Sequence, residues 1–356
     1  MKIILSGGAT LGPVIPLLAI VESYRERYPD TQFLWVGTKH GPEKELIQKY
    51  NIPFFSLSTG KWRRYSSLLN IIDLCKIVGA FVWSLYFLLR EKPNLLISAG
   101  GFVSVPLHWA AALLAMPMWV HQQDARVGLA NKLMFPSATK VTVALGSTSR
   151  ELKQFSAEWI GNPSRDLHVS DKNKAREKFH IPFDAPVVFA MGGGTGSASV
   201  NKLILEALPH WPRAWQVIHL VGKDRPQDLS KRAADVFQNY HVYEFFSDEM
   251  KDAYAVADVV VARAGFSTLS EIAMLEKAAV IIPMSGTHQE DNTTEFEKEG
   301  GIQVLHEDLD SGLKLAAMVK RIMDDPGLRA RMGQCMHRLL PRTKKEKVIH
   351  IIDSLV

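Results

Sequence analysis

A chain of 356 residues is long enough for two domains, and its 47% apolar and 22% charged residues are typical of packed globular cores rather than of disorder. The net charge of +5 favours phosphorylated substrates or an anionic membrane surface as partners, while no Lys/Arg block, zinc-finger spacing or RNA-binding signature indicates nucleic acid. The only two cysteines, Cys75 and Cys335, lie far apart, which argues against a disulfide framework and a cysteine metal site and fits a reducing cytosol.

Strands and helices alternate through the first half of the chain. The apolar run at 2–5 meets glycines at once, so we interpret it as a buried first strand and not as a signal peptide. A helix is predicted over 14–28, with further strands at 33–37, 95–101, 118–123 and 140–145. This order indicates parallel βαβ units with helices on both faces of a sheet.

The same pattern restarts in the second half. A strand and a glycine loop are predicted at 186–199, followed by strands at 215–222, 241–246, 258–265 and 278–284. We therefore predict two Rossmann-like, doubly wound α/β domains at 1–162 and 163–340, with a terminal helix at 341–356 packing back on the first. Since ligands bind beyond the carboxyl ends of parallel strands, we expect one site in a cleft between the two sheets.

A glycine loop follows the first strand of each half, at 6–12 and at 192–197. Glycine lets the backbone approach a ligand closely, and the following helix N-terminus attracts phosphate. Neither loop has the spacing of a dinucleotide-binding motif or of a P-loop, which disfavours a dehydrogenase. The alternative is a tight turn between strand and helix; ligand contact is favoured for the second loop, and both interpretations stay open for the first.

Seven segments in order, spread over almost the whole chain, resemble the MurG family of bacterial glycosyltransferases. They are SGGATLGPVIP (6–16), AGGFVSVP (99–106), HQQD with GLANK (121–132), GNPSR (161–165), GGGTGS (192–197), RAGFSTLSE (263–271) and HQEDN (288–292). The resemblance implies a GT-B fold, with acceptor and membrane on the N-terminal domain and the UDP-sugar mainly on the C-terminal one. It also implies no metal and no other cofactor, since helix N-termini and loop amides can neutralise a diphosphate.

The activity implied by this resemblance is an inverting transfer of N-acetylglucosamine from UDP-N-acetylglucosamine. The acceptor would be the undecaprenyl-diphosphate-linked muramyl pentapeptide of peptidoglycan, reached by a peripheral protein at the cytoplasmic face of the cell membrane. Two alternatives stay open: a GT-B transferase with another UDP-sugar or a glycolipid acceptor, and a non-catalytic UDP-sugar-binding protein of the cell-wall machinery.

The resemblance also assigns donor-binding residues. It implies that Glu271 binds the ribose hydroxyls, a task that suits a carboxylate because it can accept two hydrogen bonds from a vicinal diol. Gln289 and Asn292 would meet the donor sugar, and Phe246 would pass near uracil. The whole implied set is Arg165, Gly194, Thr195, Gly196, Phe246, Arg263, Ser267, Thr268, Glu271, Gln289 and Asn292. The structural alternatives are a first-turn glutamate at 271, an ion pair at Arg263 and N-caps at 267 and 268.

The acceptor half departs from the family pattern at two places. Its implied acceptor and diphosphate residues are Thr10, Gly12, Gly100, Gly101 and Ser104, but the family's loop histidine is replaced by Pro13, which has no titratable group. The family's His-Glu-Gln-Asn becomes His121-Gln122-Gln123-Asp124, so one carboxylate is gone and another stands two residues later.

These departures leave the catalytic base to be found. An inverting transfer needs a base beside the acceptor hydroxyl, and we expect Asp124, or with less support His121, to supply it. The alternative for Asp124 is a helix N-cap or a salt bridge with Arg126.

A membrane-contacting helix is predicted near residues 68–92. Its apolar run from Ile77 to Leu89 is 13 residues long, short of the roughly 20 that span a bilayer, and Lys61, Arg63 and Arg64 precede it. We expect Phe81, Trp83 and Phe87 to form the membrane patch; the alternative is a helix buried all round.

Overall fold

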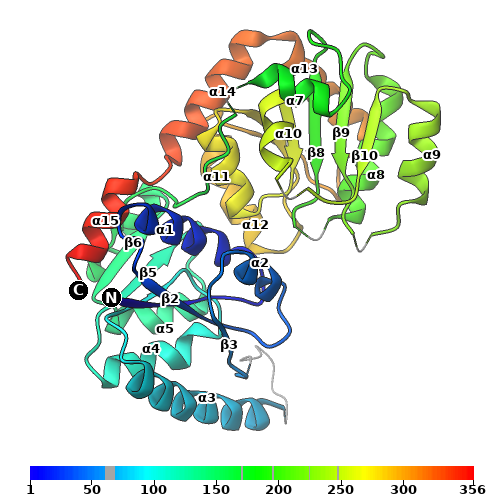
Figure 1. Ribbon diagram of the computed structural model, residues 1–356. Helices are drawn as coiled ribbons and strands as arrows, with labels where there is room; N and C mark the ends of the chain where they lie inside the picture. Colours follow the sequence, from blue (N-terminus) through cyan, green and yellow to red (C-terminus); the bar gives the residue numbers. More distant parts are fainter. Residues whose placement is uncertain (61–68, 170, 195, 224, 247) are drawn as a thin grey trace. The chain divides into compact units, whose positions relative to one another are not determined.

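The computed structural model describes residues 1–60, 69–169, 171–194, 196–223, 225–246 and 248–356, which form two compact units (Figure 1). Unit 1 consists of residues 1–165 and 342–356, and unit 2 of residues 166–341. Each unit is built around one parallel sheet with helices on both faces, which confirms the predicted fold class.

The sheet of unit 1 has seven strands in the order β3-β2-β1-β4-β5-β6-β7, all paired in parallel. Its strands are β1 (Lys2–Ser6), β2 (Gln32–Gly37), β3 (Phe54–Ser56), β4 (Leu95–Ser98), β5 (Met118–Gln122), β6 (Lys140–Val143) and β7 (Glu158–Trp159).

Alternate side chains of β1 enter two different cores. Ile3 and Leu5 pack with α1 (Val14–Arg27), α2 (Glu43–Lys49) and α15 (Lys345–Asp353), whereas Ile4 packs with α3 (Leu69–Glu91) and α4 (Ser104–Leu113). The remaining helices of the unit are α5 (Leu129–Met134) and α6 (Gly146–Glu151). A strand apolar on both faces is what a doubly wound sheet requires.

The sheet of unit 2 has six parallel strands in the order β10-β9-β8-β11-β12-β13. They are β8 (Val187–Met191), β9 (Gln216–Leu220), β10 (Tyr240–Tyr243), β11 (Val259–Ala262), β12 (Ala278–Ile281) and β13 (Gln303–Val304). The helices are α7 (Lys172–Lys178), α8 (Ala198–Ala207), α9 (Asp228–Val236), α10 (Met250–Val256), α11 (Phe266–Met274), α12 (His288–Lys298), α13 (Gly312–Asp324) and α14 (Pro326–Leu339).

The strand order reverses once in each sheet, between β1 and β4 in unit 1 and between β8 and β11 in unit 2. Loops that follow strands on either side of a reversal diverge to opposite faces, so a crevice opens at that edge and ligands bind there. Both predicted glycine loops, and the loops after β4 and β11, lie at these two positions.

The terminal helix α15 belongs to unit 1, where it packs against α1 (Figure 1). The Tyr24 hydroxyl donates a hydrogen bond to the Asp353 carboxylate at 2.8 Å. Burial, and then this carboxylate, raise the pKa of Tyr24 above its ordinary value. Unit 1 is therefore completed by residues that follow unit 2 in the sequence.

Candidate active site

Two glycine loops meet at the strand reversal of unit 1. Gly101 has a φ of +91°, and a Cβ placed on it would lie 3.4 Å from the backbone nitrogen of Gly8. Ser104 is fully buried, and its hydroxyl donates to the carbonyl of Gly100 at 3.1 Å. The loop after β4 therefore packs directly on the loop after β1, and the Ser104 hydroxyl stabilises the loop after β4 by its hydrogen bond to Gly100.

The end of β5 adds a third part to this edge. A Cβ on Gly12 would lie 3.4 Å from Nε2 of Gln123 and 3.6 Å from the hydroxyl of Thr10. Pro13, with a φ of −67°, precedes the first residue of α1 and provides no side-chain cap. The predicted acceptor residues Thr10, Gly12, Gly100 and Gly101 thus gather at one edge of unit 1.

Glu43 supports the first glycine loop, a feature that the sequence did not reveal. Its carboxylate is fully buried, and Oε1 accepts a hydrogen bond from the backbone nitrogen of Thr38 at 2.7 Å. A Cβ on Gly8 would lie 2.2 Å from Oε1, and one on Gly41 would lie 1.8 Å from Oε2. Both positions therefore need glycine because the carboxylate fills the space of a side chain.

His121 is enclosed in a closed hydrogen-bond network. Its Nδ1 lies 2.9 Å from the Thr142 hydroxyl, its Nε2 lies 2.9 Å from Oδ1 of Asn162, and the side chain is fully buried. Burial lowers the pKa of His121 to about 4, against a smaller opposite effect of Asn162. A neutral ring with both nitrogens occupied has a structural role and is not placed to take a proton from a substrate.

Asp124 lies in the loop between β5 and α5 and is half-buried. Its backbone carbonyl accepts a hydrogen bond from Nε2 of Gln122 at 2.7 Å. Since α5 begins at Leu129 after Gly128, Asp124 is not the N-cap of that helix. Of the two predicted bases, His121 is fully buried, and only Asp124 lies on a partly exposed loop at the acceptor edge.

The glycine loop of unit 2 is held tightly against its neighbours. A Cβ on Gly196, whose φ is +70°, would lie 2.5 Å from the carbonyl of Val221, and Gly194 is exposed. Ser197 caps α8 by accepting from the backbone nitrogen of Val200. Thr195, also predicted to bind the donor, lies outside the described residues.

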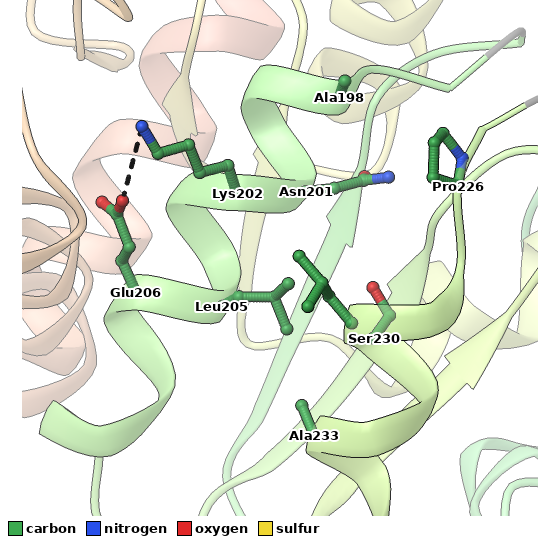
Figure 2. Close-up of a pocket in the computed structure, with 9 residues that line it drawn as sticks. Ala198, Asn201, Lys202, Leu205, Glu206, Pro226, Ser230 and Ala233 are labelled. Carbon is green, nitrogen blue, oxygen red and sulfur yellow. Dashed lines mark ion pairs between the residues drawn. The ribbon is translucent and has the colours of Figure 1, made fainter.

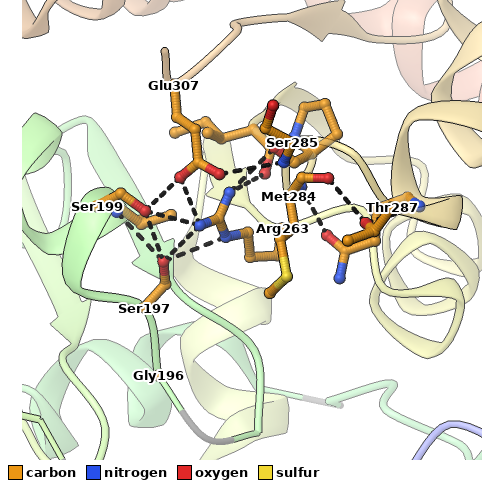
Figure 3. Close-up of polar contacts among 12 residues, drawn as sticks. Gly196, Ser197, Ser199, Arg263, Met284, Ser285, Thr287 and Glu307 are labelled. Carbon is orange, nitrogen blue, oxygen red and sulfur yellow. Dashed lines mark hydrogen bonds and ion pairs between the residues drawn. The ribbon is translucent and has the colours of Figure 1, made fainter. Parts of the chain in front are cut away.

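Arg263 links the loops at the carboxyl edge of unit 2 (Figure 3). Its guanidinium donates to Ser197 Oγ at 2.8 Å and to Glu307 Oε2 at 2.6 Å. It also donates to the carbonyls of Ile282 and Pro283, both at 3.1 Å. The side chain is 6% exposed, so the structural ion pair named as the alternative is present. The Arg263 network joins the segments that follow β8, β11, β12 and β13.

Glu271 and the start of α11 lie beside this network. Glu271 is 5% exposed and accepts a hydrogen bond from the Tyr254 hydroxyl at 2.9 Å. Glu271 is the sixth residue of α11, so it is not the first-turn glutamate given as its alternative. The N-cap of α11 is Gly265, so Ser267 and Thr268, which lie in the first turn, are not N-caps. The Ser267 hydroxyl is shielded from solvent and has no partner among the described residues.

The remaining predicted donor residues divide between the site edge and the core. Gln289 and Asn292 begin α12; Oε1 of Gln289 accepts from the Met284 nitrogen at 3.1 Å, and Asn292 donates to the Ala264 carbonyl at 3.3 Å. Phe246 instead packs its ring against Phe179 and is 5% exposed, so only its backbone can face a base. Arg165 is the half-buried last residue of the first segment of unit 1.

A cavity of about 540 Å³ lies between α8 and α9 rather than at the strand reversal (Figure 2). Lys202 and Glu206 at its rim pair with each other at 3.8 Å. Asn201 donates to the Val221 carbonyl at 3.0 Å, and its Oδ1 lies 3.1 Å from the buried His219 ring. Because these polar groups are already paired within unit 2, we do not place the donor in this cavity.

The helix α3 exposes a different face from the one we expected. Phe87 is 4% exposed and stacks on Trp83, with ring centroids 4.7 Å apart. Phe81 and Trp83 are half-buried against the same core. Phe87 therefore belongs to the interior of unit 1, which corrects its choice as a membrane-contacting residue, whereas Phe81 and Trp83 are partly exposed and stay predictions.

The exposed apolar side chains of α3 recur at helical spacing, and the helices α4 and α5 also expose apolar side chains. We call them the α3–α5 apolar face: Val78, Val82, Tyr86 and Leu89 on α3, Trp109 and Leu113 on α4, and Leu129 and Leu133 on α5. The exposed basic residues Lys76, Arg90 and Lys132 lie on the same helices. In the parts of the chain that the structure describes, no helix is both long and apolar enough to cross a bilayer.

Comparison with known proteins extends over both units. The glycosyltransferase family 28 N-terminal domain matches residues 3–143, and its C-terminal domain matches residues 187–350. A Clostridium perfringens protein is 35% identical over 323 residues, 89% of each chain. A Lachnospira eligens protein is 32% identical over 329 residues, 91% of each chain. Both are named UDP-N-acetylglucosamine–N-acetylmuramyl-(pentapeptide) pyrophosphoryl-undecaprenol N-acetylglucosamine transferase.

Solved structures share the fold. MurG of Acinetobacter baumannii superimposes with a TM-score of 0.78 at 23% identity over 99% of both chains. The UDP-GlcNAc 2-epimerase of Neisseria meningitidis, solved with UDP-GlcNAc bound, gives 0.71 at 13% identity over 99% of this chain and 100% of that one. The resemblance inferred from the seven segments is confirmed.

Proposed function

The chain belongs to glycosyltransferase family 28, and we propose that it transfers N-acetylglucosamine from UDP-N-acetylglucosamine to the lipid-linked muramyl-pentapeptide precursor of peptidoglycan. The observation that carries the proposal is the similarity to transferases of this name, which extends over about nine-tenths of both chains and includes both sheets. The loops at the two strand reversals supply one edge for an acceptor and one for a nucleotide.

The test is transfer of labelled sugar from UDP-N-acetylglucosamine to a short-chain lipid-linked muramyl-pentapeptide, in detergent and without added metal. We expect a lipid-linked disaccharide, and we expect Glu271→Ala to abolish it. Tyr254→Phe is the matched control, because it removes the hydroxyl that donates to Glu271 and keeps the carboxylate. Absence of product alongside intact UDP-N-acetylglucosamine binding would favour a different acceptor or a non-catalytic role.

Unit 2 provides the groups for the donor. Glu271 would accept from the ribose hydroxyls, and the shielded hydroxyl of Ser267 would donate to the diphosphate near the N-terminus of α11. Gln289 and Asn292 would face the sugar from the first two turns of α12. Arg263 would act by fixing Ser197 and the glycine loop, since its guanidinium is already surrounded by protein partners.

Asp124 would act as the base at the acceptor edge. It would take the proton of the acceptor hydroxyl while that oxygen attacks the anomeric carbon and UDP departs from the opposite face. We expect Asp124→Asn to lower kcat by a factor of about 10²–10⁴, the range for loss of general base catalysis, with little change in the KM for UDP-N-acetylglucosamine. Full turnover by this variant would remove Asp124 from the mechanism.

The α3–α5 apolar face would bind the membrane surface on which the acceptor resides. Val82 and Tyr86 are 60% and 63% exposed, and the basic residues of the same helices would attract anionic lipid at the cytoplasmic face. We expect wild-type protein to float with anionic liposomes and Val82→Glu/Tyr86→Glu not to float. The control is Leu229→Glu/Leu309→Glu, which adds the same charges to exposed leucines of unit 2. Equal flotation of all three proteins would count against this face.

A further inference from the structure

We propose that Gln122 is a positioning residue for the transfer reaction: it holds the loop between β5 and α5 so that Asp124 stands at the acceptor edge. The inference rests on the proposed role of Asp124. Gln122 itself is 2% exposed and is not placed to touch a substrate.

The Gln122 side chain joins three elements of unit 1. Its Nε2 donates to the backbone carbonyls of Asp124 at 2.7 Å and Arg126 at 3.3 Å. Its Oε1 accepts from Nδ2 of Asn131, on α5, at 2.6 Å. Since Gln122 is also the last residue of β5, one amide ties the strand end, the loop and the helix together.

The direction of these bonds is fixed by the partners. Two backbone carbonyls can only accept, so the nitrogen of Gln122 must face the loop. Asn131 Nδ2 also reaches the His121 carbonyl at 3.4 Å, so its nitrogen must face the strand and the oxygen of Gln122. A carboxylate at position 122 would have no proton to donate and would set its charge against both carbonyls of the loop.

Gln122 and Asp124 are the two residues at which this segment departs from the His-Glu-Gln-Asn pattern of the family that it resembles. The chain has an amide at 122 where the family has a carboxylate, and a carboxylate at 124 where the family has an amide. The loop that now carries Asp124 is held at the carbonyl of that residue by the new amide. The two exchanges therefore act together: Gln122 fixes the loop, and Asp124 carries the charge.

The experiment compares kcat and KM for wild type, Gln122→Glu, Gln122→Met, Asp124→Asn and Gln122→Glu/Asp124→Asn. Gln122→Met keeps most of the volume without adding a buried charge, so it guards against a glutamate that merely unfolds the protein. We expect both Gln122 variants to lower kcat at least tenfold and to leave the KM for UDP-N-acetylglucosamine within about twofold. In the Asp124→Asn background, we expect Gln122→Glu to lower kcat less than twofold further, because the residue that it positions is already lost.

Two results would overturn the inference alone: wild-type kcat in both Gln122 variants beside an inactive Asp124→Asn, or an equal fall in kcat from Gln122→Glu with and without Asp124. The second result would assign Gln122 a general structural role. Wild-type kcat in Asp124→Asn would instead remove the base on which the inference rests, and would be recognised in that variant by itself.

Discussion

Replacing Arg263 by methionine is the most direct test of how unit 2 holds the loops at the carboxyl edge of its sheet together. The substitution keeps a long apolar stem but removes the donors that meet Ser197, Glu307 and two backbone carbonyls. Glu307, 10% exposed as a side chain, would keep its charge and lose its cation. Removing one partner of a buried ion pair costs about 3–5 kcal/mol, a large share of a typical domain stability of roughly 5–15 kcal/mol.

The assay measures the free energy of unfolding in urea. Hydrogen exchange of peptides from β8 and β11 then reports on the stability of unit 2. The matched control is Lys320→Met, which breaks the exposed Lys320–Asp324 pair of α13 and should cost roughly 0–1 kcal/mol. We expect Arg263→Met to lower the free energy of unfolding several times more than the control. Equal losses would show that the Arg263 network does not stabilise the loops as the distances imply.

The same difference should depend on pH. Burial alone would raise the pKa of Glu307, but the hydrogen bonds from Arg263, Ser199 and the Ser285 backbone outweigh it and lower that pKa. A carboxyl with a depressed pKa contributes stability above the pKa of the unfolded chain, near 4.3, and loses it as pH falls through the folded value. We therefore expect the gap between wild type and Arg263→Met to be full at pH 7 and to shrink below about pH 4.

Two further predictions concern buried groups. Gly41→Ala should lower the free energy of unfolding by about 1–3 kcal/mol, because its Cβ would lie 1.8 Å from Glu43. Gly79→Ala in α3, where nothing lies within 4 Å of the new Cβ, should raise it by about 0.5–1 kcal/mol. Equal melting temperatures of the two variants would contradict the packing at Glu43. Burial also holds the pKa of three histidines well below 6.5, at about 4, 4 and 3: His108, His121 and His219. Because the unfolded chain binds these protons first, the free energy of unfolding should fall as the pH drops from 6.5 towards 4. His219→Asn should make that fall smaller in urea titrations.

The sequence predicted the sheets well wherever strands are long and apolar. The strands β3, β7 and β13 were missed because they have only two or three residues and lie at or near sheet edges, which leaves no periodic signal. The glycine loops were found because their composition is unusual. The contact between the first glycine loop and the loop after β4, at Gly8 and Gly101, depends on strand order, which the sequence did not provide.

Side-chain roles were harder to predict than backbone elements. The apolar run of α3 has no charged residue to mark its outer face, so Phe87 and Val82 were indistinguishable in the sequence although one is core and the other is exposed. The partner of Arg263 stands 44 residues away at Glu307, beyond the reach of any local pattern. The sequence showed Gln122 only as a departure from the family pattern. The structure shows that its side chain donates to the carbonyls of Asp124 and Arg126.

The return of α15 to the first unit has a consequence for synthesis on the ribosome. Unit 1 lacks one of its packing helices until residues 342–356 emerge, after all of unit 2 has been translated. At about 5–20 residues per second, that leaves the face of α1 uncovered for on the order of 10–30 s. The unit made second can complete its core first, and a premature stop near the carboxyl terminus would damage the half of the protein that was translated earliest.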